Sequence, residues 1–105
     1  MTEASLTIGL VQRVMGWRPG DGRWITGPSR RWQPLSSFRP TERVQDALQL
    51  LEHAQADYTI ASRGGAVVAE VIVAGRSARA RGTVLPLALC QALAKALGVE
   101  TEDAA

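Results

Sequence analysis

Aromatic and cationic side chains are concentrated in one part of the chain, between Gly16 and Pro40. All three tryptophans and the single phenylalanine lie there, and five arginines stand against one aspartate, for a formal charge of +4. Arginine neutralises phosphates and tryptophan rings stack on unpaired bases, so this composition is typical of sites for single-stranded nucleic acid. The same two residue types dominate the energetic centres of protein interfaces. The stretch is therefore the first candidate for a binding function.

Three interpretations of this stretch stay open. In the first it docks on a partner protein, and in the second it binds single-stranded nucleic acid, helped by Arg79 and Arg81 further along the chain. In the third the tryptophans fold the stretch against the rest of the domain, with arginine stems lying over their faces. The residues expected to contact a partner are Arg23, Trp24, Arg30, Arg31 and Trp32.

Side chains that could carry catalysis are isolated from one another in the sequence. Cys90 and His53 are the only cysteine and the only histidine, whereas a metal site needs several converging ligands. Cys90 stands among leucines in a helical pattern and is expected to be a small buried side chain, while His53 is expected to face solvent. A nucleophilic Cys90 would need His53 beside it in space as a base. We expect no enzyme activity, no metal and no cofactor.

One carboxylate, Glu70, interrupts an apolar run from Val67 to Val73. A carboxylate in such a strand must be paired, protonated or placed at the rim of a layer. We expect a structural ion pair across the sheet rather than a catalytic acid, because no second carboxylate is placed to share the work. The candidate partners of Glu70 are Arg63, Arg79 and Arg81.

Apolar side chains recurring every three to four residues predict three helices. These helices cover residues 3–15, 42–55 and about 85–98. Gly9 lies inside the first helix, where it costs about 1 kcal/mol relative to alanine unless packing or a close approach of another segment compensates. Thr41 and Thr83 are expected to cap the second and third helices, and Pro86 fits only in a first helical turn.

Between the second and third helices the period of the apolar residues changes from about four to two. A strand is predicted from Asp57, followed by a tight hairpin at Gly64-Gly65 and a second strand over 66–74. The chain turns again at Gly75-Arg76, and residues 78–81 alternate small with charged side chains, as an edge strand with one solvated face does. The second strand is apolar on both faces apart from its glutamate, so we expect it to be central and covered on both sides.

These elements predict an α+β fold in which one sheet lies between helices. The fold is a three-layer α/β/α sandwich: a three-stranded antiparallel meander with helices on both faces, in the order α, long loop, α, β, β, β, α. With 105 residues, the chain fits one domain over residues 1–99. Residues 16–40 form an irregular connection inside this domain, and residues 100–105 form an acidic, disordered tail.

Several segments resemble a known family in their order along the chain. They are Val14-Met15-Gly16-Trp17, the stretch from Trp32 to Ser36, the stretch from Ala47 to Glu52, and Pro86-Leu87-Ala88-Leu89-Cys90. Together they resemble the phage ABA sandwich domain, a family of small phage and prophage proteins. The resemblance implies an α/β/α sandwich and a phage origin, but no established activity that can be assigned to a residue.

The sequence thus predicts a non-catalytic phage or prophage accessory protein that binds a macromolecular partner. A host or phage protein is the expected partner, for example a protein of a bacterial defence system that this chain would inhibit, as anti-CRISPR proteins do. Single-stranded nucleic acid is the alternative partner. No apolar run reaches the roughly 18 residues of a membrane span and no secretory segment follows Met1, so we expect no membrane association and a place in the host cytoplasm. The chain is expected to be a monomer or a homodimer.

Overall fold

The computed structural model describes residues 3–26 and 31–99; the predicted acidic tail at 100–105 lies outside them. In chain order the elements are α1 (Glu3–Met15), β1 (Arg18–Gly20), β2 (Arg23–Ile25), β3 (Trp32–Pro34), the short 3-10 helix η1 (Leu35–Ser37), α2 (Val44–His53), β4 (Asp57–Arg63), β5 (Ala66–Val73), β6 (Arg76–Gly82) and α3 (Leu85–Leu97). Strands β1–β3 form one antiparallel sheet and β4–β6 form another, each in chain order.

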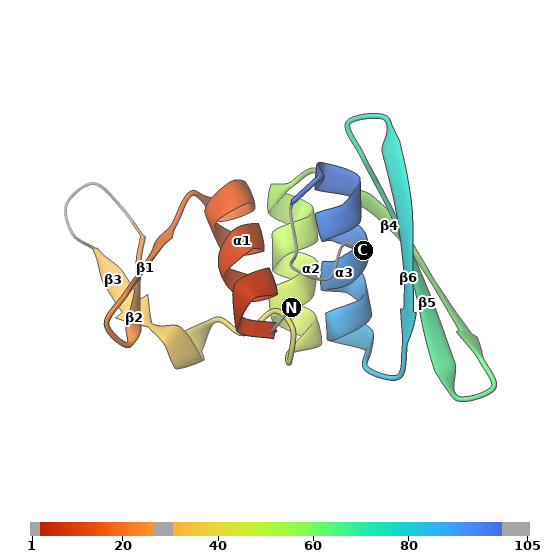
Figure 1. Ribbon diagram of the computed structural model, residues 1–105, viewed down its shortest axis with the longest axis horizontal. Coiled ribbons are helices and arrows are strands. Elements are labelled where there is room, and N and C mark those ends of the chain that lie inside the picture. The colour runs from red at the N-terminus through yellow and green to blue at the C-terminus, as the bar shows by residue number, and fades with distance from the viewer. Residues whose placement is uncertain (1–2, 27–30, 100–105) are drawn as a thin grey trace.

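The helices lie between the two sheets (Figure 1), with the β1–β3 sheet at one end of the molecule and the β4–β6 sheet at the other. The α+β class is therefore confirmed. The prediction of helices on both faces of the β4–β6 sheet is wrong, because all three helices stand on the same side of it. The connection predicted to be irregular over 16–40 is also different, since three short strands occur within it.

The pairing register of β5 explains why its apolar run was misleading. Ala69, Val71 and Val73 point toward α3 and are buried, whereas the alternate residues Val68 and Ile72 point to the other side. Ile72 remains 42% exposed there. The outward face is thus only half-buried, and its partial cover comes from neighbouring strands rather than from a helix. A continuous apolar run does not by itself require two covered faces.

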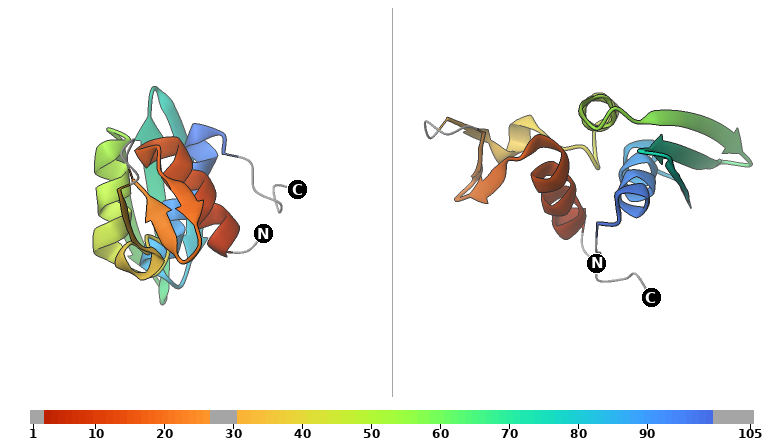
Figure 2. Two further views of the ribbon diagram at one scale, coloured as in Figure 1. Left: turned by 90° about the vertical axis from the view of Figure 1, so that its left-hand side faces the viewer. Right: turned by 90° about the horizontal axis from the view of Figure 1, so that it is seen from above.

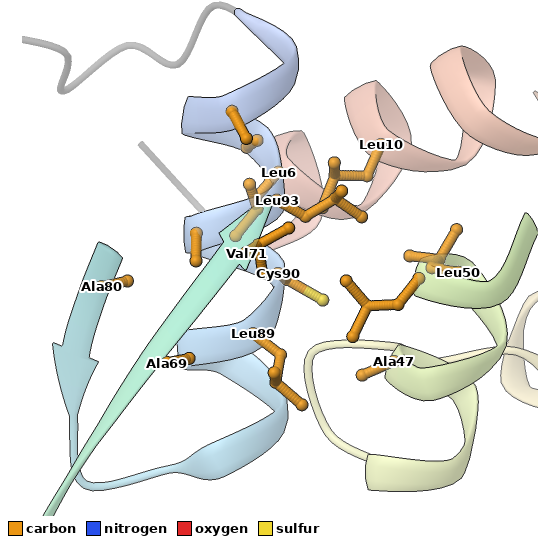
Figure 3. Close-up of a cluster of buried hydrophobic side chains, with 14 of the residues drawn as sticks. Leu6, Leu10, Ala47, Leu50, Ala69, Val71, Ala80, Leu89, Cys90 and Leu93 are labelled. Atoms are coloured by element: carbon orange, nitrogen blue, oxygen red, sulfur yellow. The ribbon is translucent and has the colours of Figure 1, made fainter. Parts of the chain in front are cut away.

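Leucines from all three helices meet beneath the β4–β6 sheet (Figure 3). Leu6 and Leu10 of α1, Leu50 of α2 and Leu93 of α3 are buried, and Val71 of β5 points toward them. Burying one such side chain contributes about 1.5–3 kcal/mol relative to leaving it exposed. This aliphatic core holds the three helices together and fixes the orientation of α3 against β5 and β6.

Both hairpins of the larger sheet turn through two residues in left-handed conformations. Gly64 and Gly65 have φ angles of 53° and 82°, which confirms the predicted hairpin. The second turn lies at Ala74 and Gly75, with φ angles of 52° and 77°, one residue before its predicted place. Both turns match the right-handed twist of the flanking strands. As a result β6 begins at Arg76 rather than near residue 78.

The predicted helix ends are confirmed where proline or glycine determines the backbone conformation, but not where a threonine side chain was expected to cap the helix. Gly98 adopts the left-handed conformation after α3, and Pro86 lies in the first turn of that helix, as predicted. The predicted caps at Thr41 and Thr83 are wrong, since the residues before α2 and α3 are Arg43 and Val84, without side-chain caps. Thr41 is instead buried, because the chain at this point packs against α1.

Candidate functional site in the β1–β3 sheet

Antiparallel pairing in the β1–β3 sheet sorts the tryptophan-rich and arginine-rich stretch into two faces. Trp24 points to the inner face, toward α1, together with its pairing partners Pro19 and Gln33. The residues of the opposite face, here called the Trp32 face, are Arg18, Arg23, Ile25, Trp32 and Pro34. Because successive side chains in a strand point to opposite sides, two tryptophans that look equivalent in the sequence take opposite roles.

Trp24 belongs to the core, with 2% of its surface exposed. Its ring lies 6.5 Å from that of Trp17, which in turn meets Phe38 edge-on at 5.3 Å between centroids. The prediction that Trp24 contacts a partner is therefore corrected, because nearly all of its surface is covered by the chain itself. Its indole Nε1 has no hydrogen-bond partner in the described part of the chain.

Trp32 is the exposed tryptophan, with 54% of its surface accessible. The guanidinium carbon of Arg23 lies 4.7 Å from the centroid of its ring, a cation–π contact. The Nε of Arg23 also donates to the backbone oxygen of Asp21 at 3.3 Å, which holds the guanidinium in place. Such a contact is worth about 0.5–1 kcal/mol at an exposed site, so the ring is oriented while it stays in solvent.

The remaining predicted contact residues are divided between the two ends of the molecule. Arg31 is exposed next to β3, where its carbonyl accepts a 2.7 Å hydrogen bond from the amide of Thr26. Arg30 lies outside the described residues. Arg79 and Arg81 are on β6, in the sheet at the opposite end (Figure 1). The structure therefore brings Arg23 and Trp32 together but does not join them with the two β6 arginines.

A pocket of about 280 Å³ opens where the inner side of the small sheet meets α1. Its apolar lining consists of Ile8, Pro19, Trp24, Leu35 and Phe38, and its polar lining of Thr7, Arg39, Thr41 and Glu42. The hydroxyls of Thr7 and Thr41 lie 3.5 Å apart, and the Arg39 guanidinium pairs with the Glu42 carboxylate at 3.2 Å. Sequence patterns could not reveal this pocket, because its lining comes from segments that meet only in the folded chain.

The two side chains considered for nucleophilic catalysis lie in different surroundings, one buried and one exposed. Cys90 is buried in α3 and its Sγ donates to the Pro40 carbonyl at 3.3 Å. Burial raises the pKa of the Cys90 thiol to about 12, which favours the unreactive protonated form. His53 is exposed at the end of α2, and its Nδ1 lies 3.0 Å from the Gln49 carbonyl. The positions expected for both residues are confirmed.

Glu70 pairs across the sheet as predicted. Arg79 is its direct neighbour on β6, and the Arg79 Nε donates to Glu70 Oε2 at 3.0 Å. Both groups are solvent-accessible on the outward face of the sheet, with 73% of the Arg79 side chain exposed. An exposed pair of this kind contributes about 0–1 kcal/mol. The interaction identifies Glu70 as a structural residue of the sheet surface.

Fold and site define an α+β protein with three helices between two antiparallel sheets and an exposed tryptophan–arginine pair on the smaller sheet. The fold is similar to that in the crystal structure of a phage protein from Bacillus cereus ATCC 14579, with a TM-score of 0.75. The two chains share 15% sequence identity, over 97% of this chain and 93% of the other. No family model and no curated protein matches this sequence.

The similarity shows that this chain shares its fold with that phage protein. Membership of the ABA sandwich family stays a prediction, as does the host cytoplasm as its location. In the described ranges, 3–26 and 31–99, no helix is long and apolar enough to cross a membrane. Within those same ranges no group of three or more His, Cys, Asp or Glu side chains could hold a metal ion.

Proposed function

We propose that this chain is a non-catalytic phage or prophage accessory protein that binds another protein through its Trp32 face. The observation that carries the proposal is the 54% exposure of Trp32 beneath the Arg23 guanidinium. A large exposed aromatic ring, oriented before binding, loses little conformational entropy when a partner covers it. The fold shared with a phage protein supports a phage origin. The partner that we propose is a protein of the bacterial host, including the proteins of its defence systems.

The shape of the Trp32 face favours a protein over single-stranded nucleic acid. Surfaces that bind single-stranded nucleic acid stack successive bases on several aromatic rings along a basic groove. Trp24 and Phe38 are buried, so they cannot provide a second ring next to Trp32. One side of the Trp32 ring is already covered by Arg23. Arg18, Arg23 and Arg31 nevertheless give this end a positive charge, so nucleic-acid binding is kept as an outcome of the test.

The test compares capture of bacterial lysate proteins by the wild type and by Trp32→Ala. Trp32→Ala is expected to weaken binding of the captured protein at least tenfold, because central interface tryptophans contribute about 2 kcal/mol or more. Val84→Ala is the matched control, since Val84 is 46% exposed at the start of α3, in another part of the fold. Equal capture by the wild type and Trp32→Ala would exclude the Trp32 face as the binding surface.

Nuclease treatment and salt separate the two partner classes. A protein partner is expected to remain bound after nuclease treatment. If the ligand is single-stranded nucleic acid, affinity must fall steeply with salt, with a log–log slope on the order of −3 for four or five phosphate contacts. A nuclease-sensitive, salt-sensitive complex that requires Trp32 would replace the protein-binding proposal with the nucleic-acid alternative.

A further inference from the structure

Strand β4 leaves one whole edge of the larger sheet open. All seven of its residues are exposed, and among the described strands it pairs with β5 alone. Seen from above (Figure 2, right), it lies at the border of the sheet, and no helix of residues 3–26 or 31–99 covers its outer edge. Proteins usually protect such an edge with lysine, proline or a bulge. The β4 sequence, Asp57-Tyr58-Thr59-Ile60-Ala61-Ser62-Arg63, contains no lysine, proline or glycine.

The hairpin at Gly64-Gly65 determines which backbone groups face this open edge. A two-residue turn is closed by hydrogen bonds between its flanking residues, here Arg63 and Ala66. Hydrogen-bonded and non-hydrogen-bonded pairs alternate along an antiparallel ladder. The backbone N–H and C=O groups of Tyr58, Ile60 and Ser62 must therefore point away from β5, toward the open edge of the sheet. These three residues therefore present a row of unpaired donors and acceptors, with Ile60 at its centre.

The other edge of the sheet agrees with this alternation rule, and a lysine binds one of its carbonyls. In β6 the same reasoning, applied from the turn at Ala74-Gly75, directs the carbonyl of Arg79 outward. The Nζ of Lys95 does donate to that carbonyl, at 3.1 Å. If β6 paired antiparallel with β6 of a second copy over its whole length, Arg79 would lie opposite Arg79, and these like charges would repel each other. Of the two edges, only the one formed by β4 suits a second copy of this chain.

We infer that β4 pairs antiparallel with β4 of a second copy about a twofold axis at Ile60, which joins the two sheets into one of six strands. In this register Ile60 lies opposite Ile60, and Tyr58 lies opposite Ser62. All outward N–H and C=O groups of the three central residues then find partners. The register is also the one that pairs every residue of the strand, so that Asp57 of each copy lies opposite Arg63 of the other.

Charge complementarity favours this arrangement over its alternatives. Asp57 and Arg63 stand at opposite ends of β4 and on the same face, so the antiparallel pairing forms two attractive pairs. A parallel pairing in register would place like charges together at both ends, which is destabilising. Ile60, which is 40% exposed, would gain cover from its own copy on the face that it shares with Ala69.

Disulfide trapping tests the position of the twofold axis. Residues opposite each other in a hydrogen-bonded antiparallel pair have Cα atoms about 5.5 Å apart, within disulfide range, so Ile60→Cys is expected to form a covalent dimer under mild oxidation. Thr59→Cys is the matched control. In the same register it lies diagonal to its own copy, about 7–8 Å away, and should crosslink poorly. The native Cys90 is buried and leaves the introduced thiol as the accessible one.

A charge exchange tests the pairing without introducing a crosslink. The wild type is expected to shift from monomer to dimer over an about hundredfold range of concentration in sedimentation velocity. Asp57→Arg and Arg63→Asp should each weaken this association on the order of tenfold, since each creates two like-charge pairs. An equimolar mixture of the two variants should recover the dimer, because every end pair is again attractive.

Three results would overturn the inference. The first is a wild type that remains monomeric at every concentration while Ile60→Cys and Thr59→Cys crosslink equally. The second is a dimer that Asp57→Arg and Arg63→Asp leave unchanged, which would place the interface elsewhere. The third is two variants that are each monomeric, retain native circular dichroism, and fail to associate when mixed. None of these outcomes depends on Trp32, so the proposed function stands or falls separately.

Discussion

The structure predicts that replacing Trp24 lowers the free energy of unfolding far more than replacing Trp32. Trp24→Ala takes a ring that is 2% exposed out of contact with Trp17 and α1, and such substitutions cost about 3–5 kcal/mol. At about 4–8 °C per kcal/mol for a domain near this size, the melting temperature should fall by at least about 12 °C. Trp32→Ala removes an exposed ring and one cation–π contact, so its cost should stay below about 1 kcal/mol.

The assay is urea unfolding of both variants, followed by far-UV circular dichroism. Trp24→Phe provides an internal check: it keeps part of the buried ring and removes an indole N–H without a partner, so it should cost less than Trp24→Ala. Iodide quenching of fluorescence gives an independent measure, because the accessible emission should be lost with Trp32 and retained without Trp24. Equal losses of stability for the two alanine variants, or a loss under about 1 kcal/mol for Trp24→Ala, would refute the assignment of Trp24 to the core.

Two further predictions concern the helical layer. The pKa of the Cys90 thiol is raised from 9.0 to about 12 on folding, so the folded state holds the proton more tightly. The free energy of unfolding should therefore decrease as the pH rises from 9 toward 12, by at most about 1.4 kcal/mol per pH unit. Cys90→Ala should flatten this decrease in pH-dependent unfolding experiments, and an identical slope in both proteins would contradict the burial of the thiol. A Cβ on Gly9 would lie 3.1 Å from Val99 Cγ1, so Gly9→Ala should stabilise the chain by about 1 kcal/mol only when Val99→Ala removes the contact. A double-mutant cycle without coupling would show that the two residues do not touch.

Much of the local structure follows from the residues alone. The spacing of Leu6 and Leu10 in α1, and of Leu89 and Leu93 in α3, predicted helices that the structure contains. Gly64-Gly65 predicted a hairpin because glycine adopts positive φ angles without steric cost. Such features depend on neighbours within a few positions of the chain, and for this reason a single sequence reveals them.

Helix caps were less predictable because the contacts of a side chain can outweigh its local preference. Thr41 has the hydroxyl of a capping residue, yet α2 begins only at Val44, and Thr41 is buried near Thr7 of α1. The α2 carboxylate of Asp46 accepts instead from the Arg39 amide at 2.8 Å, reaching back along the chain. Local preferences for caps amount to about 1 kcal/mol, an amount that packing between distant segments readily exceeds.

The candidate site, too, was predictable in its position along the chain but not in the exposure of its side chains. Its location in the stretch between Gly16 and Pro40 was predicted from composition. Which tryptophan is exposed was not, because Trp24 and Trp32 differ only in the register of three short strands that the sequence did not reveal. Among glycines and prolines, strands of three residues produce no recognisable alternation of apolar and polar side chains.

The amino-acid sequence by itself determined the three helices, the two hairpins of the larger sheet, an arginine partner for Glu70 across the sheet and the segment that carries the candidate site. Only the tertiary structure decided that all helices lie on one side of that sheet, that Trp24 is buried while Trp32 is exposed, and that β4 has an open edge. The physical reason is range: backbone conformation and side-chain periodicity act between near neighbours, whereas burial and the stacking of layers depend on residues that meet only when the whole chain has folded.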